Sequence, residues 1–453
     1  MFQGLKSFPY SKRSISRGKT IEKNTALRNR VIYQVYVRNH STEGSFKALA
    51  ADLDRIRNLG VDMIQLLPIH PIGKKNRKGA LGSPYAISDY RGINPELGTM
   101  EDFRRLVTAM HDRGIGCIMD VVYNHTSPDS VLAREQPLWF YRRKDGSPGN
   151  RIGEWWDVID LDYGNPGSGL WEYQIQTLKT WAGIVDGFRC DVAPLVPLEF
   201  WLKAREELAT VNPRCIWIAE SVEPSFILEN RARGFVCHSD AELFRAFDVC
   251  YDYDIFPVFE NYLNGSASLA AYAEKINSQE YIYPAAYVKL RNLENHDKNR
   301  AAHSIRNGRA LYNWTAFNYF QKGLTLIYAG QEVAADSRPD LFDKDPVHWN
   351  TGKDLSPLMR ALYRIKGDPL LASSAYTVQA LNEETLLGIH RGGLAFGGRI
   401  ILGIFCLNGR GGVFPVPVPD GNYTNLLDGS PVRTGGGSIQ VHGEPVIFEY
   451  RET

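Results

Sequence analysis

The stretch Gly187-Phe188-Arg189-Cys190-Asp191-Val192-Ala193 has the composition of a short buried strand that carries one arginine and one carboxylate. Side chains two positions apart on a strand lie on the same face, so we expect Arg189 and Asp191 to point the same way. A guanidinium beside a carboxylate keeps it ionised, as a nucleophile at neutral pH requires. The same spacing is also typical of a purely structural ion pair, so the surrounding sequence has to decide between the two.

Outward from this stretch, short apolar runs alternate with amphipathic stretches, which is the βαβα pattern of a parallel α/β fold. The amphipathic periodicity predicts helices over Phe46–Leu59, Met100–Arg113 and Trp171–Trp181. The apolar runs predict eight strands, the number that a closed barrel needs: Val31–Val37, Met63–Leu67, Cys117–Tyr123, Val185–Cys190, Ile216–Ala219, Phe247–Tyr251, Ala286–Leu290 and Thr325–Tyr328.

The pattern changes at two places, and these changes predict the domain organisation. A polar, aromatic and glycine-rich stretch after the third strand is too long for an ordinary loop and predicts an inserted subdomain. Late in the chain, apolar runs separated by Gly, Asn and Asp turns predict an antiparallel β domain. We therefore expect a (β/α)8 TIM barrel with an insert and a C-terminal β-sandwich, preceded by a tail: tail 1–27, barrel 28–125 and 166–370, insert 126–165, β-sandwich 371–453.

Composition excludes several classes of function. Lys and Arg number 52 against 51 Asp and Glu, so charge offers no attraction for nucleic acid or an anionic membrane. The 6 cysteines are scattered without zinc-ligand spacing, and we interpret them as reduced, buried side chains. No apolar run is long enough to cross a membrane, and Met1–Thr20 lacks the apolar core of a signal peptide. A cytoplasmic, soluble protein is expected.

Polar clusters follow four of the predicted strands, at the carboxyl ends where barrel enzymes hold their reactive groups. One such cluster alone is equally typical of a helix cap or a packed histidine. Four clusters, after the third, fourth, fifth and seventh predicted strands, favour one shared site: Asp120-Val121-Val122-Tyr123-Asn124-His125, Arg189 with Asp191, Ile218-Ala219-Glu220-Ser221, and Asn292-Leu293-Glu294-Asn295-His296-Asp297.

These four clusters are similar to the four signature regions of the α-amylase superfamily, glycoside hydrolase family 13. The matching segments read DVVYNH, GFRCD, IAES and LENHD. The first strand and the segment from Ser83 to Tyr90 resemble the family as well, and the likeness extends over about Val31 to Gly330. Glu294, and an alanine rather than glycine before Glu220, are small departures from the family pattern.

The resemblance implies that Asp191 is the nucleophile, Glu220 the general acid/base and Asp297 the transition-state stabiliser of a retaining glycosidase. Such an enzyme needs one ionised carboxylate and one protonated acid about 5 Å apart. Arg189 is expected to keep Asp191 charged, while Asp191 and Asp297 raise the pKa of Glu220.

The same resemblance implies roles for the residues around these acids. His125 and His296 correspond to the pair that hydrogen-bonds the sugar beside the cleaved bond, and Tyr85 to the ring that stacks on it. Arg189 belongs to the substrate site, and Asp120 is expected to brace it in a structural role.

Asn124 and Asp160 align with family calcium ligands between barrel and insert, so a structural Ca²⁺ is possible on this resemblance, although the chemistry requires no cofactor. Calcium takes six to eight oxygens, and only these two side chains are supplied by the pattern. Trp155 and Trp156 of the insert are expected either to line outer sugar subsites or to form the core of the insert.

The leading hypothesis is hydrolysis of α-1,4-glucosidic bonds in maltodextrins or starch-derived glucans, with retention. The segment Asp160-Leu161-Asp162 is closer to the amylase type than to the α-1,6-glucosidase type. Glucan transglycosylation at the same site, α-1,6 cleavage, a non-catalytic glucan-binding member and a barrel enzyme of phosphate-sugar chemistry remain as alternatives. The expected partner is an α-glucan. No dimer-building N-terminal β module is evident, which favours a monomer.

Overall fold

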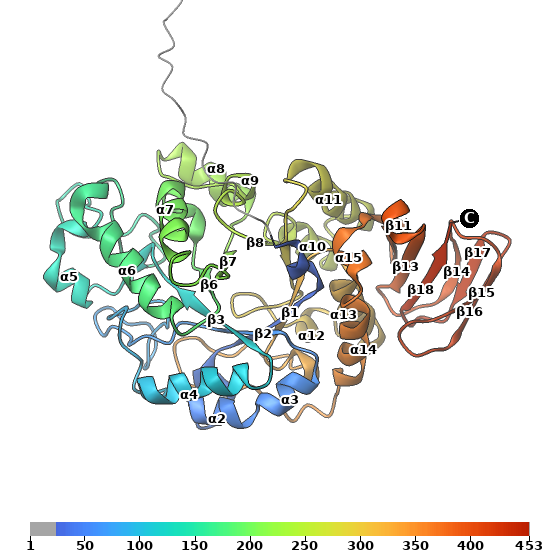
Figure 1. The fold of residues 1–453 in the computed structure, drawn as a ribbon, viewed down its shortest axis with the longest axis horizontal. Coiled ribbons are helices and arrows are strands. Elements are labelled where there is room, and N and C mark those ends of the chain that lie inside the picture. Colours follow the sequence, from blue (N-terminus) through green and yellow to red (C-terminus); the bar gives the residue numbers. More distant parts are fainter. Residues whose placement is uncertain (1–23, 453) are drawn as a thin grey trace, which may run out of the picture.

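Eight parallel strands form the closed barrel that the sequence predicts (Figure 1). The computed structural model describes residues 24–452, so most of the expected tail 1–27 lies outside the described residues. The strand order around the barrel is β1-β10-β9-β8-β7-β6-β3-β2, closed by the pairing of Ile32 with Leu326. The strands are β1 (Val31–Val35), β2 (Met63–Leu66), β3 (Gly116–Val121), β6 (Gly187–Cys190), β7 (Ile216–Ala219), β8 (Val249–Tyr251), β9 (Lys289–Arg291) and β10 (Leu324–Tyr328).

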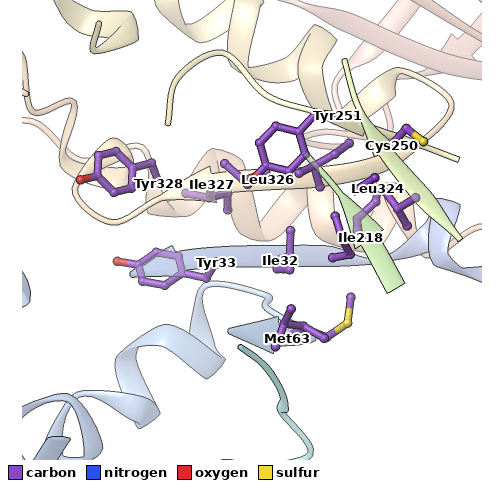
Figure 2. Close-up of a cluster of buried hydrophobic side chains, with 14 of the residues drawn as sticks. Ile32, Tyr33, Met63, Ile218, Cys250, Tyr251, Leu324, Leu326, Ile327 and Tyr328 are labelled. Atoms are coloured by element: carbon purple, nitrogen blue, oxygen red, sulfur yellow. The ribbon is translucent and has the colours of Figure 1, made fainter. Parts of the chain in front are cut away.

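Buried apolar side chains fill the barrel and the layer between its strands and helices (Figure 2). Ile32, Ile218 and Leu326 come from three different strands, and each is fully buried in one continuous cluster. Branched side chains of this kind pack the interior of parallel barrels. The barrel is therefore a rigid support for whatever its strand ends carry.

Helices surround the barrel, and two of the predicted elements differ from the structure. The single helix expected over Phe46–Leu59 is two helices that meet at Asp52, whose carboxylate accepts hydrogen bonds from Arg55 and contacts His40. The strand expected over Ala286–Leu290 begins only at Lys289, after a turn in which Tyr287 N donates to Pro284 O. The longer helices are α2 (Phe46–Ala51), α3 (Leu53–Asn58), α4 (Met100–His111), α6 (Leu170–Ala182), α7 (Leu198–Leu208), α8 (Pro224–Ala232), α10 (Phe256–Leu263), α11 (Leu269–Ile282), α13 (Gly308–Phe320) and α14 (Ser356–Lys366).

Short elements complete the barrel and the insert. In the insert, β4 (His125–Thr126) pairs antiparallel with β5 (Ile159–Asp160), which brings the end of the insert back to its beginning. This pairing anchors the insert beside the strand end that carries His125. The remaining short helices are α1 (Val37–His40), α5 (Val131–Glu135), α9 (Asp240–Leu243), α12 (Ala301–Ser304) and α15 (Pro369–Ser373).

The C-terminal region is the antiparallel β-sandwich that the turn-rich sequence predicts. One sheet has the order β11-β12-β13-β18 and the other β14-β17-β16-β15. Side chains from both, such as Leu402 and Phe414, form a second apolar core. In residues 24–452 no helix combines the length and apolar composition that crossing a membrane requires. The strands are β11 (Ala375–Asn382), β12 (Thr385–Arg391), β13 (Arg399–Cys406), β14 (Gly412–Pro415), β15 (Gly421–Thr424), β16 (Pro431–Gly435), β17 (Ser438–Val441) and β18 (Val446–Arg451).

Candidate active site

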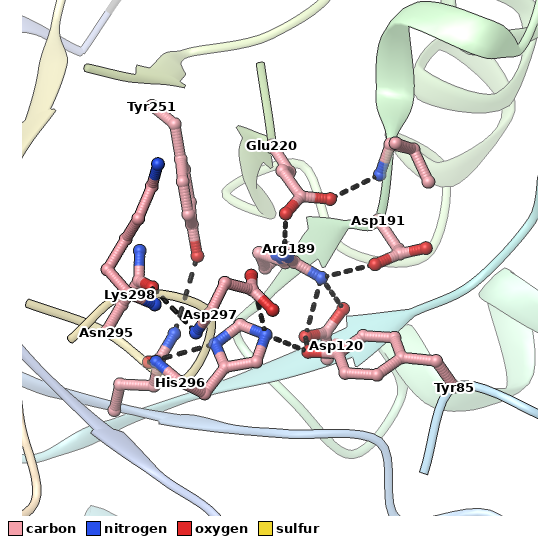
Figure 3. A network of polar contacts seen from close by, with 12 residues as sticks. Tyr85, Asp120, Arg189, Asp191, Glu220, Tyr251, Asn295, His296, Asp297 and Lys298 are labelled. Carbon is pink, nitrogen blue, oxygen red and sulfur yellow. Dashed lines mark hydrogen bonds and ion pairs between the residues drawn. The ribbon is translucent and has the colours of Figure 1, made fainter. Parts of the chain in front are cut away.

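Arg189 lies at the centre of a group of carboxylates at the carboxyl ends of β3, β6 and β7 (Figure 3). Its Nη1 donates to Asp120 Oδ1 at 2.8 Å and to Asp191 Oδ1 at 2.9 Å. Its Nη2 lies 2.6 Å from Glu220 Oε1. One fully buried guanidinium therefore orients all three acids, and the expected brace between Asp120 and Arg189 is present.

The backbone beside the predicted nucleophile holds Glu220 from its other side. Val192 N donates to Glu220 Oε2 at 2.7 Å. Val192 has a φ of 37°, a left-handed conformation that a β-branched residue rarely adopts. Such strain persists where the surrounding structure imposes it, and here it directs one N–H group at the carboxyl group of Glu220.

Burial gives these acids unusual proton affinities. The pKa of Asp191 is raised to about 7 and that of Glu220 to about 8, and burial is the largest cause of both shifts. Arg189 lowers both pKa values, and nearby Asp297 raises both. The expected rise for Glu220 is present, with burial as its leading cause. For Asp191 the expected effect of Arg189 is outweighed, so the carboxylate is less firmly ionised than predicted.

The two predicted sugar-binding histidines flank this group. His125 Nε2 lies 3.9 Å from Asp191 Oδ2, and its Nδ1 contacts the side-chain amide of Asn124 at 3.1 Å. His296 contacts Gln34 Oε1 through Nδ1 at 3.2 Å. Burial lowers the pKa of His125 to about 3 and that of His296 to about 4. Both rings are therefore neutral at physiological pH and suited to hydrogen-bonding hydroxyl groups.

Tyr85 connects the acids to the second histidine. Its hydroxyl donates to Asp120 Oδ2 at 3.0 Å and lies 2.6 Å from His296 Nε2 (Figure 3). Its ring is nearly parallel to that of His296, with 5.5 Å between centroids. The ring is thus fixed at the edge of the site, where a sugar could stack on it.

Asp297 completes the site from the loop after β9. Its side chain is 40% exposed, unlike the other acids, and its Oδ2 lies 3.1 Å from His296 Nε2. Asp297, Asp191 and Glu220 line one cavity of about 590 Å³, with Tyr85, His125, His296 and Trp155. The structure therefore brings the three predicted acids to one cavity, and Trp155, but not Trp156, is among its lining residues.

Each of the two possible calcium ligands already contacts a protein group. Asp160 Oδ2 accepts a hydrogen bond from Arg151 N at 2.7 Å and lies 3.3 Å from its guanidinium, while its Oδ1 is buried without a hydrogen-bond partner among the described residues. Burial outweighs Arg151 and raises the pKa of Asp160 to about 6. The side-chain amide of Asn124 contacts His125 instead. In the part of the chain described here, no three His, Cys, Asp or Glu side chains are grouped as metal ligands.

Several residues of the site could not be identified from the spacing of residues in the sequence. The N–H of Val192 acts through its backbone conformation, and Gln34 comes from the middle of an apolar strand. Lys78, Glu223 and Lys298 line the cavity from loops. Glu223 lies close after the end of β7, whereas Lys78 lies far along the loop after β2, so only Glu223 has a position that marks it as a site residue.

Comparison with family models finds two matches. Residues 12–142 match the model described as alpha amylase, catalytic domain, and residues 377–448 match the bacterial alpha amylase C-terminal domain. Sequence relatives include an α-1,4-glucan:maltose-1-phosphate maltosyltransferase of Arcanobacterium haemolyticum, 34% identical over 199 residues. That alignment covers 40% of this chain and 29% of the relative. The chain thus matches less than a third of the length of this relative.

Solved structures are similar over nearly the whole chain. An α-amylase from Lactobacillus plantarum is 44% identical with a TM-score of 0.91, and the match covers 94% of this chain and 100% of that one. A maltogenic α-amylase from Thermotoga neapolitana is 32% identical with a TM-score of 0.82, again over 94% and 100% of the two chains. Barrel, insert and β-sandwich are therefore shared with both.

Proposed function

Because the chain belongs to the α-amylase family, we propose that it cleaves α-1,4-glucosidic bonds of maltodextrins or starch-derived glucans with retention of configuration. One observation carries this proposal. Arg189 contacts both Asp191 and Glu220, and the two acids line a single cavity with Asp297. Retaining glycosidases need such a pair of carboxyl groups, one as nucleophile and one as acid, close to the same sugar.

In the first half of the reaction, Asp191 attacks the anomeric carbon. Its Oδ1 is held by Arg189, which leaves Oδ2 to form the bond. Burial favours the protonated form of Glu220 with a pKa of about 8, so Glu220 can donate its proton to the leaving oxygen as the glycosidic bond breaks. The products are a covalent glucosyl ester on Asp191 and a glucan with a new hydroxyl group.

In the second half, water attacks the same carbon. The ionised Glu220 takes a proton from the water, the bond to Asp191 breaks, and its carboxylate returns to Arg189. Asp297 is in a position to bind sugar hydroxyls more tightly as the ring flattens toward an oxocarbenium ion. Two inversions at one carbon leave the α configuration unchanged.

Transfer to a sugar is the second candidate, favoured by the maltosyltransferase relative. The glucosyl ester is the same, and only the acceptor differs. Incubation with maltoheptaose at high concentration separates the two: shorter products alone indicate hydrolysis, whereas products longer than the substrate indicate transfer.

The anomeric configuration of the first product tests the proposal. We expect ¹H NMR to detect the α-anomer of the new reducing end before mutarotation, and we expect maltoheptaose to be cleaved faster than pullulan. A β-anomer first would exclude the retaining mechanism. No cleavage of maltoheptaose, pullulan or a cyclodextrin, with glucan binding intact, would support a non-catalytic role.

A further inference from the structure

Residues of three loops line part of the catalytic cavity. We call Lys78, Trp155, Asp157, Leu341 and Phe342 the donor-end wall, since all five line that cavity. They come from the loop after β2, from the insert and from the loop after β10. None of them belongs to the catalytic acids or to the sugar-binding residues described above.

The ammonium group of Lys78 ties the loop after β2 to the insert. Its Nζ lies 2.9 Å from Asp157 Oδ1 and donates to Glu154 O at 3.3 Å. The same ammonium lies 5.3 Å from the ring centroid of Trp156 and 5.7 Å from that of Phe342. Because the side chain of Asp157 is only 4% exposed, this ion pair is shielded from water and is stronger than a surface pair.

The third loop is fixed to the first by its backbone. Leu81 N and Gly82 N both donate to Phe342 O at 3.0 Å. Buried Arg38 donates to Gly82 O at 3.1 Å and to Leu341 O at 3.3 Å. The donor-end wall is therefore held in place before any ligand binds.

The position of the general acid identifies which part of the substrate meets this wall. Glu220 protonates the leaving oxygen, so the leaving sugar lies on the Glu220 side, where Glu223 and Lys298 form a 3.2 Å ion pair at the cavity. The sugar attacked by Asp191 lies on the other side, and in an α-1,4-glucan the chain beyond it runs to the non-reducing end. Trp155 of the donor-end wall lies 5.4 Å from His125 between ring centroids, and His125 lies 3.9 Å from Asp191, so the wall adjoins the side of the cavity that holds this end of the chain.

We propose that the Lys78–Asp157 pair closes the donor end of the cleft, so that the protein binds glucans by their non-reducing end and releases a short product of fixed length. Lys78 uses two of its three N–H donors on Asp157 and Glu154, which leaves one for a hydroxyl group of the terminal sugar. This inference rests on the proposed function and adds the direction of attack to it.

The test compares p-nitrophenyl α-maltoheptaoside with the same compound blocked by a 4,6-ethylidene group on its non-reducing glucose. We expect the wild-type protein to cleave the blocked compound at least about tenfold more slowly, because the wall leaves no room for the added group. Chromatography of early products from the free compound should give one unlabelled oligosaccharide size.

Substitutions in the donor-end wall test which residues cause the slow cleavage of the blocked compound. Lys78→Ala should raise the rate on the blocked compound about fivefold or more, and Asp157→Asn should do the same to a smaller extent. Lys74→Ala, an exposed lysine in the same loop, serves as the matched control and should leave the ratio of the two rates unchanged. Thermal melting of each variant checks its folding, and Asp157→Asn carries the test if Lys78→Ala does not fold.

The outcomes separate this inference from the proposed function. Equal rates on both compounds with a broad series of early products would overturn the donor-end wall and leave α-glucan hydrolysis standing. A ratio that Lys78→Ala and Asp157→Asn both fail to change would also overturn it. No cleavage of either compound would remove the proposed function itself.

Discussion

Two buried groups of charged side chains lie in the same barrel, and they differ in how well their charges balance. The catalytic group has one guanidinium, Arg189, facing three buried carboxyl groups. The second, which we call the β9 cluster, has two cations, Lys289 and Arg291, and three carboxylates: Asp240, Asp252 and Asp254.

Neutral partners complete the β9 cluster. Gln279 donates to Asp254 Oδ2 and Tyr283 donates to the same atom, at 2.9 and 2.8 Å. Burial raises the pKa of Asp254, but Lys289 and these hydrogen bonds outweigh it and leave the pKa lowered. In the catalytic group burial prevails and raises the pKa of Asp191 and Glu220. The catalytic group has two more carboxyl groups than cations, which keeps protons available, whereas the β9 cluster has only one more and holds Asp254 ionised.

The largest expected effect is on turnover. Asp191→Asn should lower kcat on the order of 10⁴-fold, because the covalent ester can no longer form. The variant should melt at the same temperature as the wild type or higher, since it removes one carboxyl group from a group that has too many. Steady-state kinetics with maltoheptaose and thermal melting check this. A large loss of stability would break the comparison.

The next effect is on stability. Lys289→Met should lower the free energy of unfolding by about 3–5 kcal/mol, because it leaves Asp240 and Asp254 buried without their cation. Urea unfolding measures the change. Lys203→Met, which removes an exposed pair with Glu172, is the matched control and should cost less than about 1 kcal/mol. Equal losses in the two variants would contradict a special role of the β9 cluster.

The pH dependence of kcat/KM is the third effect. Activity needs Asp191 ionised and Glu220 protonated, so the rate should fall as pH drops below about 7 and as it rises above about 8. The two limbs belong to the coupled pair of acids. A pH series with maltoheptaose measures both, and a flat profile between pH 5 and 9 would be inconsistent with the raised pKa values.

The smallest expected effects are changes in stability caused by substitutions in the insert. Arg151→Met should lower the free energy of unfolding by about 1–2 kcal/mol, because Asp160 keeps its backbone hydrogen bond but loses the guanidinium. Treatment of the wild type with EDTA should leave the melting temperature unchanged. Restoration of a lowered melting temperature by Ca²⁺ would show that an ion, and not Arg151, neutralises Asp160.

Periodicity predicted the places of the eight barrel strands, because most of them are apolar runs bounded by turns. The exception is β9, whose residues Lys289-Leu290-Arg291 are not an apolar run and which begins later than expected. Periodicity also predicted that Arg189 and Asp191 share a face, which follows from strand geometry alone.

The break at Asp52 was not predictable from periodicity, because the helical spacing of buried Phe46, Leu49, Leu53 and Ile56 continues across it. The spacing of residues does not predict the left-handed backbone conformation of Val192 either, because tertiary contacts impose that conformation.

The same limit applies to the two charged groups. Lys289 and Arg291 on β9 have the same two-residue spacing as Arg189 on β6 and Asp191 directly after it, so strand spacing alone does not separate structural charges from catalytic ones. Only the positions of residues far apart in the chain, such as Glu220 against Arg189, reveal where negative charge is in excess.

Trapping of the glycosyl ester tests the central claim most directly. A 5-fluoro-α-maltosyl fluoride should react with the wild-type protein, release its anomeric fluoride and add one 5-fluoromaltosyl unit. Peptide mass spectrometry should locate that unit on Asp191, and Asp191→Asn should not be labelled. Release of fluoride without an adduct, or an adduct on any other residue, would contradict the account of three acids acting on one sugar.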